Sequence, residues 1–100
     1  MADKLIINTD SLSRDIRSFD SRLDEIASCI SQMRDALAAL GTMWAGPSHD
    51  IYDAQFRSDC DAAEELVKEL RKFSSKLEDA GREYRNCSSK VDGIIDSLRL

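Results

Sequence analysis

The sequence contains few of the residues that interrupt helices or build the cores of β-sheets. Its 100 residues include one proline and four glycines, and only 6% are aromatic. This composition argues against a β-sandwich or barrel and favours an all-α protein. A chain of this length forms one domain at most, so we expect a single helical domain over residues 1–100.

The sequence also lacks an excess of basic charge. Its 14 lysines and arginines are outnumbered by 19 acidic residues, which gives a net charge of -5 at pH 7. Nucleic acids and anionic membranes attract basic surfaces, so we expect neither as a partner.

Long apolar runs are missing as well. The longest run, Ala36–Leu40, is far shorter than the ~18 residues of a membrane span, so no membrane insertion is expected. The N-terminal stretch MADKLIINTD becomes acidic too early for a Sec signal peptide. Any export is therefore expected to use another route, without a cleaved signal peptide.

Catalytic and metal-binding motifs are absent from the sequence. The single histidine, His49, precedes Asp50 and Asp53, but acidic residues are ordinary partners of the helix dipole in a first helical turn. No Gly-rich phosphate loop, GxSxG or HExxH motif occurs. We therefore expect no catalytic residue, no metal and no cofactor, and we do not expect an enzyme.

The cysteine pattern fits neither a disulfide framework nor a zinc site. The sequence has three cysteines, Cys29, Cys60 and Cys87, which is an odd number, and no two of them have CxxC spacing. The simplest interpretation is that they are small buried residues of amphipathic helices. A Cys29–Cys60 disulfide is a less favoured alternative, because the two positions lie at similar levels of a hairpin but on different flanks.

The first half of the chain carries an uninterrupted heptad pattern. Its apolar residues alternate at spacings of four and three: Leu12, Ile16, Phe19, Leu23, Ile26, Ile30, Met33, Leu37 and Leu40. This pattern predicts an amphipathic helix over residues 10–40, preceded by an extended segment at residues 1–9. Thr9 or Asp10 is the expected N-cap, and Gly41 suits the C-terminal end.

The second half predicts a longer helix, over residues 47–98. Pro47 fits its first turn, with Gly46 or Ser48 near the cap. Its apolar stripe comprises Tyr52, Phe56, Ala63, Leu66, Leu70, Phe73, Leu77, Ala80, Tyr84, Cys87, Val91, Ile94 and Leu98. The exposed pairs Glu64–Lys68 and Glu78–Arg82 have the spacing and order that support a helix.

The short connection at residues 41–46 predicts an antiparallel hairpin of two unequal helices, ~46 Å and ~78 Å long. Folding at Trp44 would place Asp10 near the level of Asp79, which leaves the stripe from Tyr84 to Leu98 without a partner helix. Leu5–Ile7 could cover only one turn of it.

Two helices make a thin core, so we expect a second hairpin to complete a four-helix bundle. The predicted partner or dimer interface comprises Leu12, Ile16, Phe19, Leu23, Ile26, Ile30, Met33, Leu37, Phe56, Leu66, Leu70, Phe73, Leu77, Tyr84, Val91, Ile94 and Leu98.

The connection, GTMWAGPSHD, contains the only tryptophan, proline and histidine. A Trp44-Ala45-Gly46 motif between two heptad-patterned helices resembles the WXG family of type VII (ESX) secretion proteins. The resemblance implies pairing with itself or with a related WXG subunit. It also implies export from the cytoplasm of a Gram-positive bacterium by a membrane-bound secretion ATPase. Trp44 fits two roles equally well, as a cap on the hairpin or as a recognition element, and Gly46 allows the tight reversal.

One departure from the family concerns the export signal. Members often carry Tyr-x-x-x-Asp/Glu after the second helix, but here Tyr84 is followed by Ser88 at the acidic position. This degenerate signal suggests dependence on a partner, as in the accessory subunits that bind the helical N-terminal region of LXG-type toxins. We therefore expect an adaptor, chaperone or co-secreted partner of a larger effector. The alternatives are a self-dimerising secreted substrate, a cytoplasmic structural coiled coil and a metal-responsive regulator.

Overall fold

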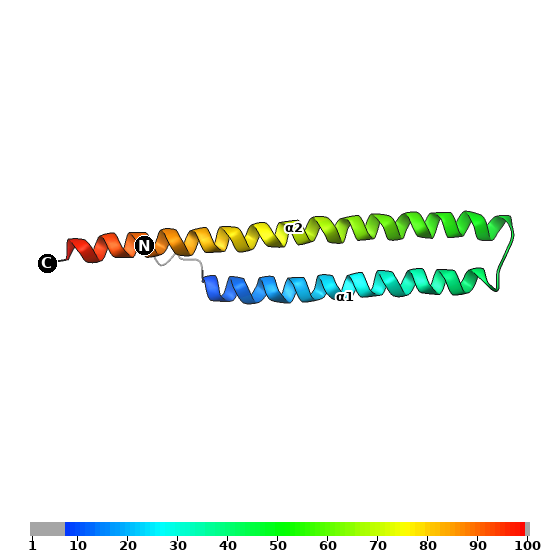
Figure 1. Ribbon diagram of the computed structural model, residues 1–100, viewed down its shortest axis with the longest axis horizontal. Coiled ribbons are helices and arrows are strands. Elements are labelled where there is room, and N and C mark those ends of the chain that lie inside the picture. The colour runs from blue at the N-terminus through cyan, green and yellow to red at the C-terminus, as the bar shows by residue number, and fades with distance from the viewer. Residues whose placement is uncertain (1–7, 100) are drawn as a thin grey trace.

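The computed structural model describes residues 8–99 and consists of two antiparallel helices joined by a short turn (Figure 1). Helix α1 spans Thr9–Gly41 and helix α2 spans Pro47–Leu98. Together they form a rod with extents of 83 × 19 × 16 Å. The expected all-α hairpin is confirmed, and each predicted helix boundary agrees with the structure to within one residue.

Helix α1 begins one residue earlier than its sequence suggests. Asn8 is the N-cap, and its side-chain Oδ1 accepts a hydrogen bond of 3.0 Å from the backbone N–H of Ser11. The prediction of Thr9 or Asp10 as the cap is therefore wrong, because both residues already lie inside the first turn. At the other end Thr42 is the C-cap, and its Oγ1 donates to the carbonyl of Ala39 at 2.7 Å.

Gly46 marks the start of α2, as expected. Its φ of 121° is the one positive value among the described residues, and Pro47 follows directly in the first turn. A Cβ at Gly46 would meet nothing within 4 Å, so space does not require glycine here. The requirement is the backbone conformation, which residues with an L side chain rarely adopt.

The core of the hairpin is a single narrow row. Large side chains of α1 (Ile16, Leu23 and Ile30) pack against a row of α2 residues spaced by seven: Cys60, Val67, Ser74 and Gly81. The predicted α2 stripe did not include this row, because only Cys60 and Val67 in it are apolar and Ser74 and Gly81 interrupt the apolar spacing. Their small size leaves room for the bulkier residues of α1, so the close contact lies beside the predicted stripe rather than along its middle.

The register between the helices differs from the prediction. Asp20 pairs with Ser74, and Ser13 lies 3.5 Å from an Arg85 nitrogen, so α1 reaches the level of Arg85 rather than Asp79. Helical side chains lean toward the N-terminus of their own helix, which is away from the turn in α1 and toward the turn in α2. Two side chains that meet therefore come from an α1 residue nearer the turn and an α2 residue farther from it. The uncovered part of α2 is therefore shorter than expected and comprises residues 86–98, which we call the C-terminal overhang. The proposed cover by Leu5–Ile7 lies outside the described residues.

Candidate functional site

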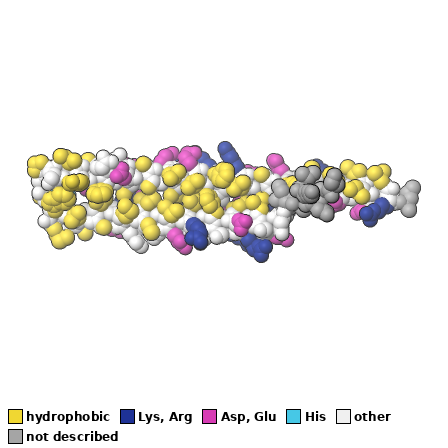
Figure 2. Space-filling view, turned by 180° about the vertical axis from the view of Figure 1, so that it is seen from behind, with side chains coloured by type: hydrophobic (Ala, Val, Ile, Leu, Met, Phe, Trp, Pro, Cys, Tyr) yellow, Lys and Arg dark blue, Asp and Glu magenta, His cyan; other side chains and the backbone are white. Residues whose placement is uncertain are grey.

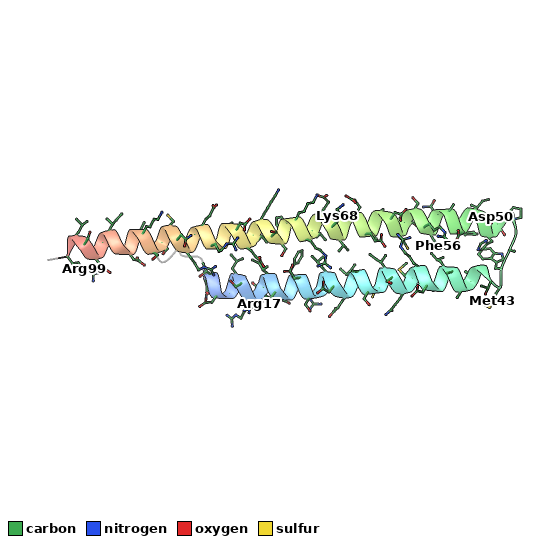
Figure 3. All side chains as sticks on the ribbon, viewed as in Figure 1. Arg17, Met43, Asp50, Phe56, Lys68 and Arg99 are labelled. Atoms are coloured by element: carbon green, nitrogen blue, oxygen red, sulfur yellow. The ribbon has the colours of Figure 1, made fainter. Side chains whose placement is uncertain are left out.

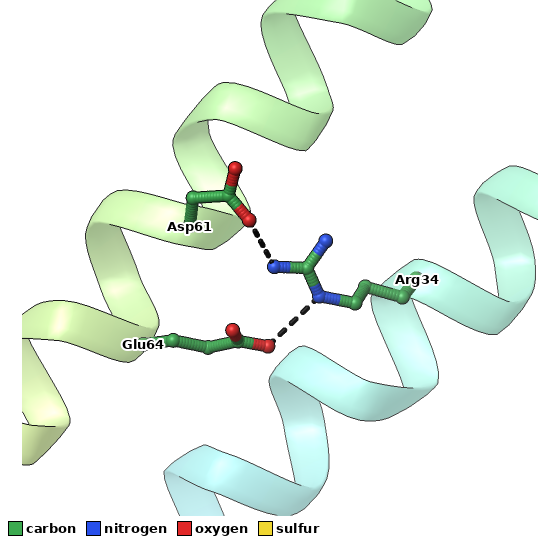
Figure 4. Close-up of polar contacts among 3 residues, drawn as sticks. All are labelled: Arg34, Asp61 and Glu64. Carbon is green, nitrogen blue, oxygen red and sulfur yellow. Dashed lines mark hydrogen bonds and ion pairs between the residues drawn. The ribbon is translucent and has the colours of Figure 1, made fainter.

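The two broad faces of the hairpin differ in chemistry, and the first of them is charged. Arg34 of α1 donates to Asp61 at 2.6 Å and to Glu64 at 2.8 Å on α2 (Figure 4). Arg71 of α2 pairs with Asp24 of α1 at 2.8 Å. We call the side of the hairpin that carries these contacts the charged face.

The two carboxylates beside Arg34 favour its charged form. Hydrogen bonds to Glu64 and then to Asp61 raise the pKa of the Arg34 guanidinium above its ordinary value. Glu64 therefore accepts from the other helix rather than from Lys68, the partner that spacing along α2 suggests. Arg82 likewise pairs with Asp79 rather than with Glu78. A contact between the helices thus replaces the predicted Glu64–Lys68 pair, and an i,i+3 contact within α2 replaces the predicted Glu78–Arg82 pair.

The opposite side of the hairpin is apolar. Ile26 and Met33 of α1 are 46% and 52% exposed, and Leu66 and Phe73 of α2 are 60% and 54% exposed. By helical periodicity these residues lie on the flank of the core row away from the ion pairs. Figure 2 shows hydrophobic side chains gathered over both helices along this side. We call it the apolar face; it comprises Ile26, Met33, Leu40, Tyr52, Phe56, Leu66 and Phe73.

The apolar pattern continues past the end of α1 into the C-terminal overhang. Residues 86–98 are all exposed, and the large apolar side chains among them are Val91, Ile94, Ile95 and Leu98. Ile94 continues the seven-residue series that contains Leu66 and Phe73 on the apolar face. A partner helix lying along this face would therefore meet apolar side chains beyond the N-terminal end of α1.

The turn end of the hairpin holds a cluster of rings. The Trp44 ring lies 5.3 Å from that of His49 and 5.8 Å from that of Tyr52, which stacks on Phe56 at 6.5 Å. Trp44 is half-buried, so it packs onto the first turns of α2, as a cap would.

Other side chains at this end remain open to solvent. Met43, at the turn end of the hairpin (Figure 3), is 80% exposed, and Ile51, which precedes Tyr52 in the chain, is 69% exposed. The Nδ1 atom of His49 lies 3.3 Å from an Asp50 carboxylate oxygen. The turn therefore combines a packed tryptophan with exposed apolar neighbours, an arrangement that fits both roles predicted for Trp44.

The predicted interface residues fall into three groups. Ile16, Leu23 and Ile30 are buried inside the hairpin. The half-buried group comprises Leu12, Phe19, Leu37, Leu70, Leu77 and Tyr84. The exposed group comprises Ile26, Met33, Phe56, Leu66, Phe73, Val91, Ile94 and Leu98. The exposed group offers a partner the most surface, and Tyr52, Ile51 and Ile95 add exposed apolar positions outside the predicted set.

The three thiols are free, and only one of them is buried. Cys60 belongs to the core row, whereas Cys29 and Cys87 are exposed. The expectation of three buried cysteines is therefore wrong for two of them. Cys87 is exposed because it lies in the overhang, and Cys29 because it lies one position before the core residue Ile30.

Across residues 8–99, no group of three or more His, Cys, Asp and Glu side chains is placed to hold a metal ion. Neither helix, as far as it is described, has a stretch long and apolar enough to cross a membrane.

Comparison with known families gives one match. A family model described as "WXG100: Proteins of 100 residues with WXG" matches residues 4–87. No curated protein and no solved structure matches the chain. The matched span includes α1, the turn and the part of α2 that α1 covers, and it ends as the C-terminal overhang begins.

Proposed function

The chain belongs to the WXG100 family, and on this basis we propose that it is an adaptor or chaperone for a larger secreted effector. Proteins of this family are small, non-enzymatic substrates of type VII secretion and commonly dimerise with related WXG partners. The proposal concerns what this member binds: a long helical segment of an effector, lying along the apolar face.

The observation that supports the proposal is the continuity of the apolar face with the overhang. Contiguous exposed apolar patches on soluble proteins commonly mark interaction sites. Helix α2 is ~78 Å long and α1 ~50 Å, so the apolar surface extends well beyond the two-helix part of the hairpin. An effector helix long enough to follow α2 would cover both parts, with Leu66 and Phe73 at the centre and Ile94 near the end.

The altered export signal agrees with this role. Tyr84 lacks an acidic residue four positions later, where Ser88 stands. In the proposed complex the effector supplies the complete signal, and the secretion ATPase recognises the complex rather than this chain alone. The chain is then exported from the cytoplasm together with its effector.

The experiment is co-purification of the tagged chain from its native host, followed by mass measurement of the intact complex. Phe73→Asp places a charge in the middle of the apolar face, and we expect it to reduce recovery of the effector at least about tenfold. Ser75→Asp is the matched control, because it adds the same charge in the same turn of α2 but away from the apolar face. Equal recovery with both variants would contradict the proposal.

A truncation after Arg85 tests the overhang separately. It removes residues that α1 does not cover, so we expect the hairpin to keep its helical content while effector binding weakens. A complex of unchanged affinity would limit the interface to the two-helix part. A mass equal to two copies of this chain, without an effector, would instead support the alternative of a self-dimerising secreted substrate.

A further inference from the structure

A hollow opens on the charged face near the N-terminal end of α1. It has a volume of about 300 Å³, its apolar lining includes Leu12, Ile16 and Leu77, and three arginines also line it: Arg17, Arg82 and Arg85. The hollow lies where the core row of α2 becomes smallest. Gly81 has no side chain there, and a Cβ at this position would already lie 3.3 Å from Leu12 Cδ2.

The charge around the hollow is opposite to that of the whole chain. The protein carries a net charge of -5, whereas the lining of the hollow combines its three arginines with one acidic residue, Glu78. Arg82 is paired with Asp79, but none of the ion pairs found within residues 8–99 involves Arg17 or Arg85. Within the described part of the chain, Arg85 has a polar contact with the Ser13 hydroxyl at 3.5 Å, which is too long to satisfy a guanidinium.

This pattern differs from the rest of the charged face. At the other contacts between the helices, each arginine has carboxylate partners: Arg34 has Asp61 and Glu64, and Arg71 has Asp24. At the hollow, by contrast, Arg17 and Arg85 have no ion-pair partner among residues 8–99 and adjoin an apolar lining. Guanidinium groups bind carboxylates through paired, charge-assisted hydrogen bonds, and the lining beside them suits an aliphatic side chain.

We propose that the hollow binds an acidic, apolar peptide segment of a protein partner. An aliphatic side chain of the segment lies against Leu12, Ile16 and Leu77, and a neighbouring carboxylate pairs with Arg17 or Arg85. A nucleic acid is a poorer fit, because it needs a basic strip longer than this single cluster on an otherwise acidic protein. The hollow opens on the charged face, so its occupancy does not depend on what covers the apolar face.

The test measures binding of a fluorescein-labelled peptide of alternating leucine and glutamate pairs to the full-length chain, by fluorescence anisotropy. We expect the double variant Arg17→Gln/Arg85→Gln to weaken binding at least about tenfold, the loss expected from charge-assisted hydrogen bonds. Arg22→Gln, an exposed arginine of α1 outside the hollow, is the matched control and should bind like the wild type. Binding should also weaken as salt is added.

A second variant tests the hollow without changing its charge. Ser13→Leu places an aliphatic side chain at the lining, and we expect it to block the peptide while circular dichroism shows unchanged helicity. Three results would overturn the proposal: equal binding by the wild type and both hollow variants, equal binding of a leucine–glutamine peptide, or displacement of the peptide by a short oligonucleotide at lower concentration than by unlabelled peptide. Phe73→Asp should leave peptide binding unchanged, so failure here is distinct from failure of the proposed effector complex.

Discussion

Val67 and Ile95 occupy equivalent heptad positions of the same helix, four heptads apart, yet their surroundings differ. Val67 faces α1 and is 7% exposed, whereas Ile95 lies in the C-terminal overhang and is 46% exposed. The heptad repeat directs both side chains toward the same side of α2. Burial, however, depends on whether a second helix is present at that level, and α1 ends before it reaches Ile95. The paired part of α2 is thus already stabilised within the chain, while the overhang retains apolar surface for another molecule.

The largest expected difference between the two regions comes from removing an apolar side chain. Leu23 is 1% exposed, so Leu23→Ala should lower the free energy of unfolding by about 3 kcal/mol. Ile95→Ala should lower it by less than about 0.5 kcal/mol, because its side chain is not packed within the chain. Urea unfolding followed by circular dichroism measures both. Similar losses would mean that the overhang is packed as tightly as the core.

Removing a hydroxyl that bonds between the helices should lower the free energy of unfolding less than Leu23→Ala does. The loss should still exceed that from removing a hydroxyl that bonds within one helix. Ser74 is 2% exposed and its hydroxyl donates to Asp20 of α1 at 2.6 Å. Ser74→Ala should therefore cost about 1–2 kcal/mol. In the overhang, the Ser97 hydroxyl donates to its own helix at the Ile94 carbonyl, and Ser97→Ala should change stability by no more than about 0.5 kcal/mol. A loss at Ser97 as large as that at Ser74 would remove the distinction.

The two glycines of α2 allow the two regions to be compared by adding a single methyl group in each. A Cβ at Gly93 would meet nothing within 4 Å, so Gly93→Ala should stabilise the helix by about 0.5–1 kcal/mol. At Gly81 the added Cβ would lie 3.3 Å from Leu12 Cδ2, so that side chain must shift and the gain should be smaller or reversed. Amide hydrogen exchange along α2 measures the effect in each region. An equal gain at both positions would show that α1 does not constrain Gly81.

The smallest effect is expected from the exposed ion pairs. Arg34→Gln removes the pairing with Asp61 and Glu64 between the helices, and the melting temperature should fall slightly at low salt. The difference from the wild type should shrink at high salt, because exposed charge pairs are screened. Arg57→Gln is the control, because it breaks a pair to Asp53 within α2 and none between the helices. Its melting temperature should fall less than that of Arg34→Gln. A loss at Arg34 that is independent of salt would point to packing rather than charge.

Much of the fold could be predicted from the sequence because its signals are local. The spacing of Leu12 through Leu40 predicts α1, Pro47 marks the start of α2, and Gly46 supplies the positive φ of the turn. The sequence does not single out the cap of α1, since Asn8, Thr9 and Asp10 all have side chains that can cap a helix. Only the backbone conformation of Asn8 selects it.

The candidate site was less predictable. The apolar stripes contain the exposed residues of the apolar face, but the sequence does not say which stripe residues the hairpin itself buries. That choice follows from the small row at Cys60, Val67, Ser74 and Gly81, whose serine and glycine carry no apolar signal. The sequence does not predict the hollow either. Its arginines come from both helices and meet only through the register of the hairpin.

The sequence by itself determined two amphipathic helices, a reversal at Trp44-Ala45-Gly46 and the unequal lengths that leave α2 partly uncovered. These features depend on the spacing of apolar residues, on backbone conformation and on the rise of a helix per residue, and each of these is set by residues close together in the chain. Tertiary structure decided the register, the division into a charged and an apolar face, and the start of the overhang after Arg85. Those features depend on how large side chains of α1 fit against small ones of α2, and that fit exists only when the two helices are in contact.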